Sequence, residues 1–353
     1  MDTRRLTLLG RTAVAACAPY LTLKLLWVLG FDIGIVDPRR FDHAVWLSAN
    51  VFTFLLDAVA ALVAHTLTRP SGLRAPAWLL AFPLWMASGL LVPLMLGVSG
   101  SLLAGPFVDG PHPMARGDFL EPWVFAVVYG GFIVEGLALF GAFAVYAHRR
   151  WGGLLRRPLR DLPNTGTRAV QRILALPAAV LAVAVGIVQL LWGTGSTLGV
   201  TAAEADARTV VVHASDCVQG LLSLAGALGV LLLLFPRLLP RRAPLVGLRV
   251  RVPLTLAWVG SAAVFACGGC LWVTRTVAGA LVAGVSRAPG GLPWLVGAAE
   301  LFTGLVLLCA GAFTLAELTA GTPKGPARPG SPDRSGMSPS RLPRRECSTV
   351  DDR

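Results

Sequence analysis

Eight apolar stretches, each long enough to cross a membrane, decide which folds are open to this chain. A transmembrane helix takes about 17–25 residues to cross about 30 Å of hydrocarbon at about 1.5 Å per residue. Runs such as the four leucines at 231–234 do not alternate apolar and polar residues, which excludes the strands of a membrane barrel. We predict an all-α, polytopic transmembrane bundle with spans at 12–30, 46–67, 77–97, 123–147, 169–192, 214–235, 253–273 and 294–320.

The composition supports this prediction. The chain has 353 residues, of which 55% are hydrophobic and 14% charged, whereas a soluble domain has about 25% charged residues. A water-soluble globule, a disordered chain and a disulfide-stabilised scaffold are therefore excluded. At the N-terminus, the apolar run continues past Cys17 to Gly30, which is typical of a spanning helix and not of a cleaved signal peptide.

Lysine and arginine are distributed unevenly between the connecting segments. The N-terminal segment, the second, fourth and sixth loops and the C-terminal tail hold 23 of the 31 basic residues, and the other loops hold six. By the positive-inside rule, we expect a cell-membrane protein with both termini in the cytoplasm. The net charge of +12 then reflects this topology and attraction to anionic lipids, and it does not indicate nucleic-acid binding.

Two parts of the chain are similar in sequence. Residues 24–34 and 189–199 share Leu-Leu-Trp and two glycines at a constant offset of 165 residues, and the fourth and eighth spans both open with Pro-Trp and contain Gly-Ala-Phe. We interpret 1–147 and 169–320 as four-helix halves forming parallel pseudo-repeats about an axis along the membrane normal, joined by an arginine-rich cytoplasmic linker, 148–168. The alternative is a chance match among abundant residues.

Two further segments have distinctive compositions. Residues 321–353 are rich in proline, serine, glycine and arginine with almost nothing apolar, so we expect a disordered cytoplasmic tail. The loop at 98–122 is rich in glycine and proline, and we expect it to pack over the outer mouth of the bundle.

Four charged side chains fall well inside the predicted spans, away from their ends. Asp57 and Glu135 lie near the middle of the second and fourth spans. Lys24 lies about three residues to the outer side of the centre of the first span, and Glu300 lies in the outer third of the eighth. An ionisable group near the bilayer centre costs about 2.5–3.5 kcal/mol, whereas a leucine returns only about 0.3–0.6 kcal/mol, so each of these groups is a functional candidate.

Three of these groups are expected to meet. At about 1.5 Å per residue, Lys24 differs in depth by about 7 Å from Asp57 and by about 4.5 Å from Glu135, within reach of a lysine side chain. We expect Lys24 to lie among the two acids, one of which is protonated near neutral pH because burial disfavours the charged form. This arrangement is a candidate proton or cation site, and an ion pair that only fixes helix register is the alternative. Gln189 replaces Lys24 in the second half, so the site is asymmetric.

A second group of polar residues lies near the outer end of the sixth span. His213 and Asp216 are one turn apart, and Gln219 lies a further turn in. They are candidates for an external binding mouth, and the alternative is that they simply face interfacial water.

Motifs for catalysis are weak. Cys267 and Cys270 form a Cys-x-x-Cys pair, but they lie in a stripe of small residues that favours close helix packing. Ser99 lies in a Gly-x-Ser-Gly sequence like that of intramembrane serine proteases, without an interior histidine as base. No Gly-x4-Gly-Lys-Ser/Thr or His-Glu-x-x-His motif is present, and the spacing of cysteines and histidines indicates no metal site or cofactor.

The first span carries a resemblance. The segment Pro19-Tyr-Leu-Thr-Leu-Lys24-Leu-Leu-Trp27-Val-Leu-Gly30, in a chain rich in alanine, arginine, glycine and proline, resembles uncharacterised eight-helix integral membrane proteins of high-GC Gram-positive bacteria. The resemblance covers this helix and the general layout. It implies a cytoplasmic-membrane location and no particular activity.

Three functions compete. The first is a secondary transporter or permease for a small molecule or ion, with its site around Lys24, Asp57 and Glu135. The second is a membrane-embedded scaffold or accessory protein that binds a partner or anionic lipid through its basic cytoplasmic face. A membrane enzyme using Cys267 and Cys270, or Ser99, is a distant third. The sequence names no substrate, coupling ion or oligomeric state.

Overall fold

The computed structural model describes residues 2–37, 43–69, 72, 74–104, 120–162, 168–236, 247–270, 272–273 and 291–320. In this part of the chain, eight helices are long and apolar enough to cross a membrane, and no β-strand occurs. The predicted all-α, eight-helix bundle is therefore confirmed. The spanning helices are α1 (Asp2–Val28), α2 (His43–Leu67), α3 (Ala77–Ala104), α4 (Pro122–Leu155), α5 (Arg168–Gly193), α7 (Val210–Leu234), α8 (Arg251–Ala262) continued by the π-helical turn η6 (Ala263–Gly269), and α10 (Leu292–Ala320).

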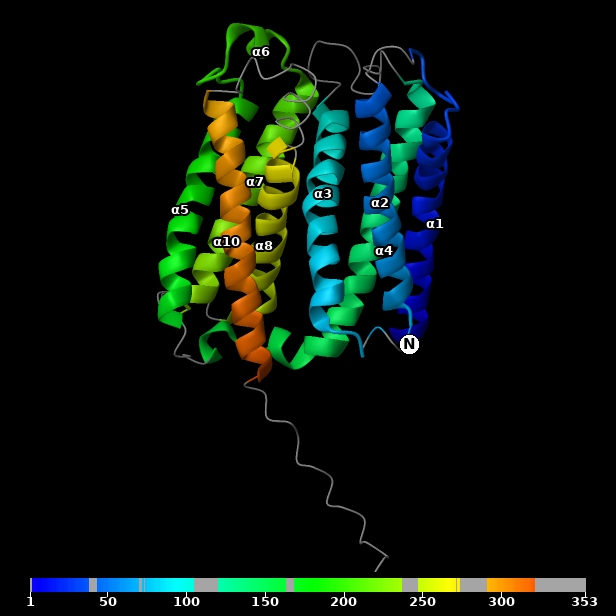
Figure 1. The fold of residues 1–353 in the computed structure, drawn as a ribbon. Coiled ribbons are helices and arrows are strands. Elements are labelled where there is room, and N and C mark those ends of the chain that lie inside the picture. Colours follow the sequence, from blue (N-terminus) through cyan, green and yellow to red (C-terminus); the bar gives the residue numbers. More distant parts are fainter. Residues whose placement is uncertain are drawn as a thin grey trace, which may run out of the picture.

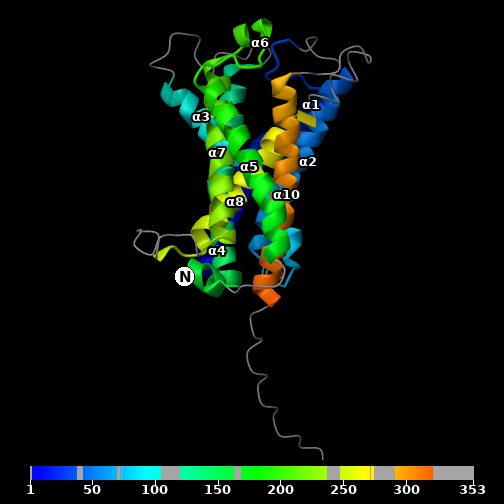
Figure 2. The same cartoon turned by 90° about the vertical axis from the view of Figure 1, so that its left-hand side faces the viewer.

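The spanning helices stand side by side, and two short helices lie in their connections (Figure 1). These are η4 (Leu159–Asp161) and α6 (Ala202–Asp206), and α6 lies beyond one end of the bundle (Figure 2). We call this end the α6 end. The start of α1 and the end of α10 both lie at the opposite end, as an even number of crossings requires (Figure 1). That this opposite end is cytoplasmic stays a prediction.

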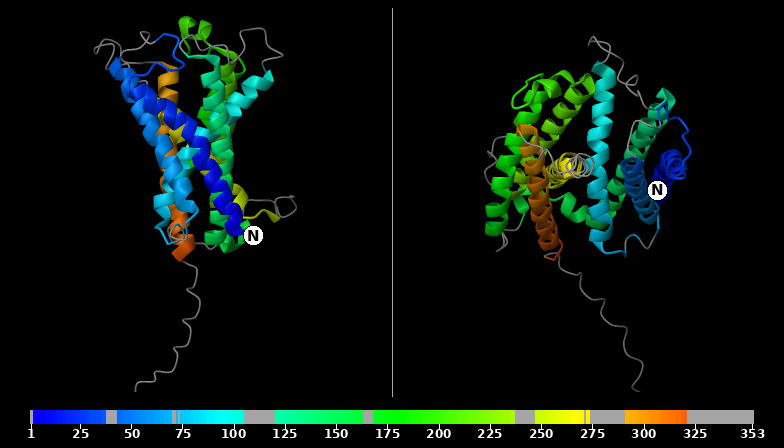
Figure 3. Two further views of the ribbon diagram at one scale, coloured as in Figure 1. Left: turned by 90° about the vertical axis from the view of Figure 1, so that its right-hand side faces the viewer. Right: turned by 45° about the horizontal axis from the view of Figure 1, so that its top comes forward.

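Helix α3 lies between two groups of helices (Figure 3, right). Helices α1, α2 and α4 gather on one side of it, and α5, α7 and α10 on the other. By sequence α3 belongs to the first half, but it packs against α7, α8 and η6 as well as against α4. It therefore forms much of the contact between the two halves.

Several helices extend beyond the predicted spans. Helix α1 begins at Asp2, ten residues earlier than expected, and α3 continues to Ala104. The first turns of α1 carry the exposed Arg4 and Arg5, charged residues that apolar length leaves out of a predicted span. The expected disordered tail, 321–353, and residues 105–119 of the loop expected to cover the outer mouth lie outside the described residues.

Small residues allow the helices to approach closely. A Cβ on Gly260 of α8 would overlap the backbone of Gly226 of α7, and a Cβ on Gly186 of α5 would lie 3.0 Å from the carbonyl oxygen of Gly220 of α7. Membrane helices associate through such contacts because lipid provides no hydrophobic drive for their packing. Large apolar side chains instead face outward on many helices, among them Leu62, Leu137, Ile173 and Phe302.

Trp27 and Trp192 close the ends of α1 and α5 in the same way. The indole Nε1 of Trp27 donates to the carbonyl oxygen of Ile33 at 2.9 Å, and that of Trp192 donates to the carbonyl oxygen of Leu198 at 2.8 Å. Three residues after each tryptophan, a glycine with positive φ completes a Schellman cap: Gly30 at +89° and Gly195 at +98°. Residues other than glycine adopt this backbone conformation only with strain. The two segments that match in sequence thus have the same local structure.

Helices α3 and α8 make a reciprocal contact. The indole Nε1 of Trp85 in α3 donates to Ser261 Oγ in α8 at 3.1 Å, and the indole Nε1 of Trp258 in α8 donates to Ser88 Oγ in α3, also at 3.1 Å. Each helix therefore supplies a Trp-x-x-Ser pair, and each pair both donates and accepts. This is the pattern that residues adopt across a twofold axis.

Candidate functional site

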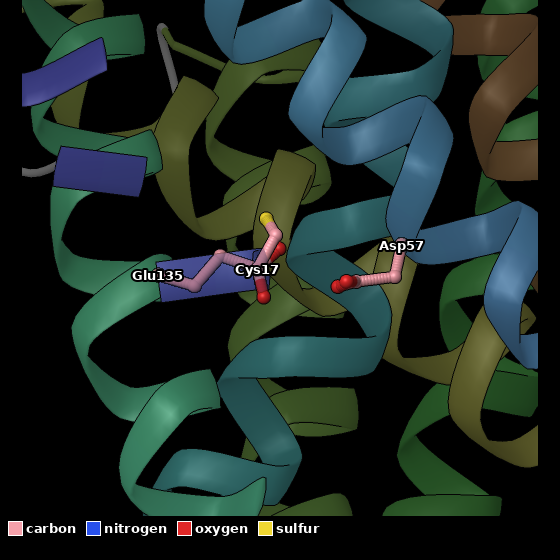
Figure 4. A group of neighbouring side chains, drawn as sticks. All are labelled: Cys17, Asp57 and Glu135. Atoms are coloured by element: carbon pink, nitrogen blue, oxygen red, sulfur yellow. The ribbon is translucent and has the colours of Figure 1, made fainter. Parts of the chain in front are cut away.

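Three helices bring Cys17, Asp57 and Glu135 together in the interior of the bundle. Cys17 is on α1, Asp57 on α2 and Glu135 on α4. The Sγ atom of Cys17 and one carboxylate oxygen of each acid all lie within 4.8 Å of one another. Figure 4 shows the Asp57 carboxylate pointing toward the other two side chains. We call these three residues the Cys–Asp–Glu cluster.

The cluster is shielded from solvent and its polar atoms are under-satisfied. Asp57 is 6% exposed and Glu135 2%. Asp57 Oδ2 and Glu135 Oε2 are buried without a hydrogen-bond partner in the described part of the chain. The thiol of Cys17 donates to the carbonyl oxygen of Ala13, 3.2 Å away. Two adjacent buried carboxyl groups cannot both stay ionised unless a cation lies beside them, so the cluster must hold a proton or another cation.

Lys24 does not lie among these acids. Its Nζ atom donates to Asn50 Oδ1 at 2.7 Å, and the amide nitrogen of Asn50 donates to the carbonyl oxygen of Trp46 at 2.8 Å. The ammonium also lies over the rings of Tyr20 and Trp27, at 5.1 and 5.0 Å from their centroids. An amide oxygen and two aromatic faces thus stabilise the cation in place of a carboxylate.

The helical register explains the difference from the expected arrangement. Lys24 follows Cys17 by seven residues on α1, and Asn50 precedes Asp57 by seven on α2, so each pair lies two turns, or about 10 Å, apart on one helix face. The Lys24–Asn50 pair therefore forms a layer nearer the α6 end than the Cys–Asp–Glu cluster. Of the three groups expected to meet, the structure brings together Asp57 and Glu135, with Cys17 in the position foreseen for Lys24.

In the second half, Glu300 is held by two amides. Its Oε1 atom accepts hydrogen bonds from Gln189 Nε2 at 2.7 Å and from Gln219 Nε2 at 3.2 Å. All three side chains are buried, with exposed fractions of 3–6%. Gln189, which replaces Lys24 by sequence, therefore contacts an intramembrane acid. Lys24 instead contacts the amide of Asn50.

The π-helical turn η6 shapes the surroundings of Glu300. Gln219 Nε2 also donates to the carbonyl oxygen of Ala263, the first residue of this turn, at 3.0 Å. A Cβ on Gly268 would overlap the Glu300 carboxylate, so a side chain there would force this carboxylate to shift. A widened turn of this kind is common at functional sites, and here it accommodates a buried acid.

Among the described residues of 169–320, no second group of cysteine and acidic side chains lies close enough to hold a metal ion. At the offset of 165 residues that relates Trp27 to Trp192, Cys17 corresponds to Ala182. The carbonyl oxygen of Ala182 accepts a hydrogen bond from Ser223 Oγ of α7 at 2.8 Å, and both residues are fully buried. That level of the second half is occupied by a satisfied neutral pair.

The polar residues at the α6 end are engaged with each other. Asp216 forms an ion pair with Arg208, whose guanidinium lies 5.8 Å from the centroid of the Trp192 ring. His213 Nδ1 is 2.9 Å from the carbonyl oxygen of Trp192. These contacts tie the start of α7 to the end of α5. Whether they form a binding mouth stays a prediction.

The weaker catalytic candidates lie apart from the cluster. Cys267 and Cys270 form no disulfide and lie on either side of Gly268 and Gly269, where η6 and the start of its continuation pack against α10. Ser99 is an exposed residue within α3. Among the described residues, neither cysteine belongs to a group of His, Cys, Asp and Glu side chains close enough to hold a metal ion.

Sequence reasoning missed Cys17 and Asn50. The spacing of cysteines along the chain carried no signal, because the partners of Cys17 come from two other helices. The spacing of polar residues along each helix did carry a signal. Cys17 lies seven residues before Lys24 and Asn50 seven before Asp57, so the residues of each pair share a helix face. Comparisons of the chain with protein-family models, with curated proteins and with solved structures give no match.

Proposed function

We propose that this multi-pass membrane protein is a secondary transporter or ion-coupled permease, with the Cys–Asp–Glu cluster as its ion site. The observation that supports this most directly is the pair of buried carboxyl groups of Asp57 and Glu135, each with an oxygen that has no partner among the described residues. Intramembrane ionisable groups are costly and typically mark ion or substrate pathways.

The geometry favours an exchangeable ion over a structural ion pair. A structural pair would set a basic side chain against the acids, whereas the nearby Lys24 bonds to Asn50 instead. The negative charge of the cluster is therefore free to bind a proton or cation that enters and leaves.

The proposal includes two parallel four-helix halves in a cell membrane, with both termini cytoplasmic. The matching caps at Trp27 and Trp192 and the reciprocal contact of Trp85 with Ser261 and of Trp258 with Ser88 support a twofold relation of the halves. Transporters are commonly built from such repeats, whose relative motion exposes the ion site to each side in turn. The resemblance to membrane proteins of high-GC Gram-positive bacteria agrees with this location.

Charge movement on ion binding tests the proposal without knowledge of the substrate. Proteoliposomes adsorbed on a solid-supported membrane are exposed to rapid jumps in proton, Na⁺, K⁺ and Zn²⁺ concentration, and the transient current is recorded. We expect the wild-type protein to give a saturable transient with at least one of these ions. The Asp57→Asn/Glu135→Gln double variant should abolish it, because no ionisable oxygen is left in the cluster.

The matched control is Glu204→Gln. Glu204 is an exposed acid of α6 whose carboxylate accepts from the backbone N–H and hydroxyl of Thr201, contacts that lower its pKa. This variant should keep the wild-type transient. A wild-type protein silent to all four ions, or a double variant with an unchanged transient, would refute the proposal.

The alternative function is a scaffold or accessory protein that binds a partner or anionic lipid through a basic face. It is favoured by the exposed arginines at the end of the bundle opposite α6: Arg4, Arg5, Arg11, Arg156 and Arg157. An unchanged phenotype in the Asp57→Asn/Glu135→Gln variant, with loss of the phenotype on deletion of 321–353, would favour this alternative.

A further inference from the structure

The donor atoms of the Cys–Asp–Glu cluster are of two chemical kinds. Cys17 offers a soft sulfur, whereas Asp57 and Glu135 offer hard carboxylate oxygens. Mg²⁺ and Ca²⁺ take oxygen ligands, while thiolate selects ions such as Zn²⁺. A mixed set of one sulfur and two oxygens therefore fits a borderline transition-metal dication better than it fits an alkali or alkaline-earth ion.

The distances suit such an ion. Three atoms that are all within 4.8 Å of one another lie within about 2.8 Å of a common point, and Zn²⁺ binds sulfur and oxygen at about 2.0–2.3 Å. Small side-chain rotations close this gap. Asp57 Oδ2 and Glu135 Oε2 accept no hydrogen bond from any described residue, so each carboxyl group has an oxygen available to bind a metal ion.

We propose that the Cys–Asp–Glu cluster binds a thiophilic divalent transition metal, with Zn²⁺ as the type ion. This inference names the ion of the proposed transport site and so rests on the proposed function. Three protein ligands leave a fourth position for water, which is the coordination of zinc sites that exchange a ligand.

The charges balance in the low-dielectric interior. On binding, the Sγ–H bond of Cys17 breaks, its proton passes to water, and the sulfur lone pair binds the metal. If Asp57 and Glu135 share one proton, the remaining thiolate and carboxylate carry two negative charges, which neutralise the dication. A neutral assembly avoids the cost of burying net charge.

The corresponding level of the second half supports this assignment by contrast. The Ala182–Ser223 pair offers no thiol or carboxylate, and its hydroxyl already donates to a backbone carbonyl. We therefore expect one metal ion per chain at this level, bound in the first half.

Metal binding is tested with the full chain, purified without a histidine tag in detergent. Co²⁺ serves as the spectroscopic probe because a Co²⁺–thiolate bond gives a near-ultraviolet charge-transfer band. We expect the wild-type protein to show this band, to lose it on addition of Zn²⁺, and to retain one zinc per chain after dialysis. Cys17→Ser should lack the band and bind zinc at least about 10–100-fold more weakly, a loss that even an outer-shell partner can cause.

The matched control is Cys309→Ser, which removes an exposed thiol of α10 and should leave the band and the affinity unchanged. If Cys17→Ser does not fold, alkylation of the wild-type protein followed by mass spectrometry replaces it. Zn²⁺ should then slow the alkylation of Cys17 and not that of Cys309. A band that persists in Cys17→Ser, equal protection of both thiols, or no band in the wild-type protein would overturn the metal site.

These outcomes separate the two proposals. Loss of the metal site with a proton or Na⁺ transient that still depends on Asp57 and Glu135 would refute only the metal assignment. A Cys17-dependent metal band without any ion-induced transient would refute transport and leave the metal site standing.

Discussion

Lys24 illustrates how a buried cation can be stabilised without a counter-ion. Its hydrogen bond to Asn50 and its position over Tyr20 and Trp27 replace the carboxylate expected from the sequence. The sequence identified Lys24, Asp57 and Glu135 as unusual because the free-energy cost of an ionisable group rises with its depth in the bilayer. The hydropathy of the surrounding span indicates that depth. The sequence could not show which of these groups are in contact, because this depends on the relative register of three helices. A shift of one helix by a single turn would change every contact.

Double-mutant cycles measure this pairing directly. Lys24→Met combined with Asn50→Leu should show a coupling free energy of about 1–2 kcal/mol, because each single change leaves the other polar group unsatisfied in the bundle. Lys24→Met combined with Glu135→Gln should be additive within about 0.5 kcal/mol, as for groups more than about 7–10 Å apart. The free energy of unfolding is measured by denaturant titration in mixed micelles. Strong coupling of Lys24 to Glu135 would contradict the two-layer arrangement.

At the level of the helices, apolar length predicted all eight spans, since it is a local property of the sequence. The ends of α1 and α3 and the π-helical turn η6 were not predictable in this way. Helix α1 begins with charged residues, which apolar length leaves out of a span. The turn η6 packs Gly268 against Glu300 of a distant helix, a contact that a local property of the sequence does not reveal. The stripe of small residues around Cys267 did indicate a tightly packed face.

Close contact between α7 and α8 leads to a prediction with an internal control. Gly260→Ala should destabilise the protein by about 1–3 kcal/mol, because the added methyl overlaps the Gly226 backbone and the helices must separate. Gly311→Ala in α10 adds a methyl where no atom lies within 4 Å, so it should be neutral or stabilising by up to about 1 kcal/mol. Thermal unfolding followed by circular dichroism compares the two variants, and equal effects would contradict the close packing.

In the molecule as a whole, the contact through α3 predicts how the two halves associate. Fragments 1–162 and 163–353, produced together as separate chains, should co-purify because α3 packs on α7, α8 and η6. Trp85→Phe with Trp258→Phe should weaken this association, because both indole donors to Ser261 and Ser88 are lost. Affinity capture of one tagged fragment measures the yield of the other. Fragments that each fold but do not associate would contradict the interface.

The same reciprocal contact has a consequence for the isolated first fragment. Residues 1–162 carry both a donor, Trp85, and an acceptor, Ser88, on one face of α3, so two copies of this fragment can satisfy each other's exposed groups. We therefore expect the fragment, when made without its partner, to form a homodimer in which each copy takes the place that the missing half normally fills.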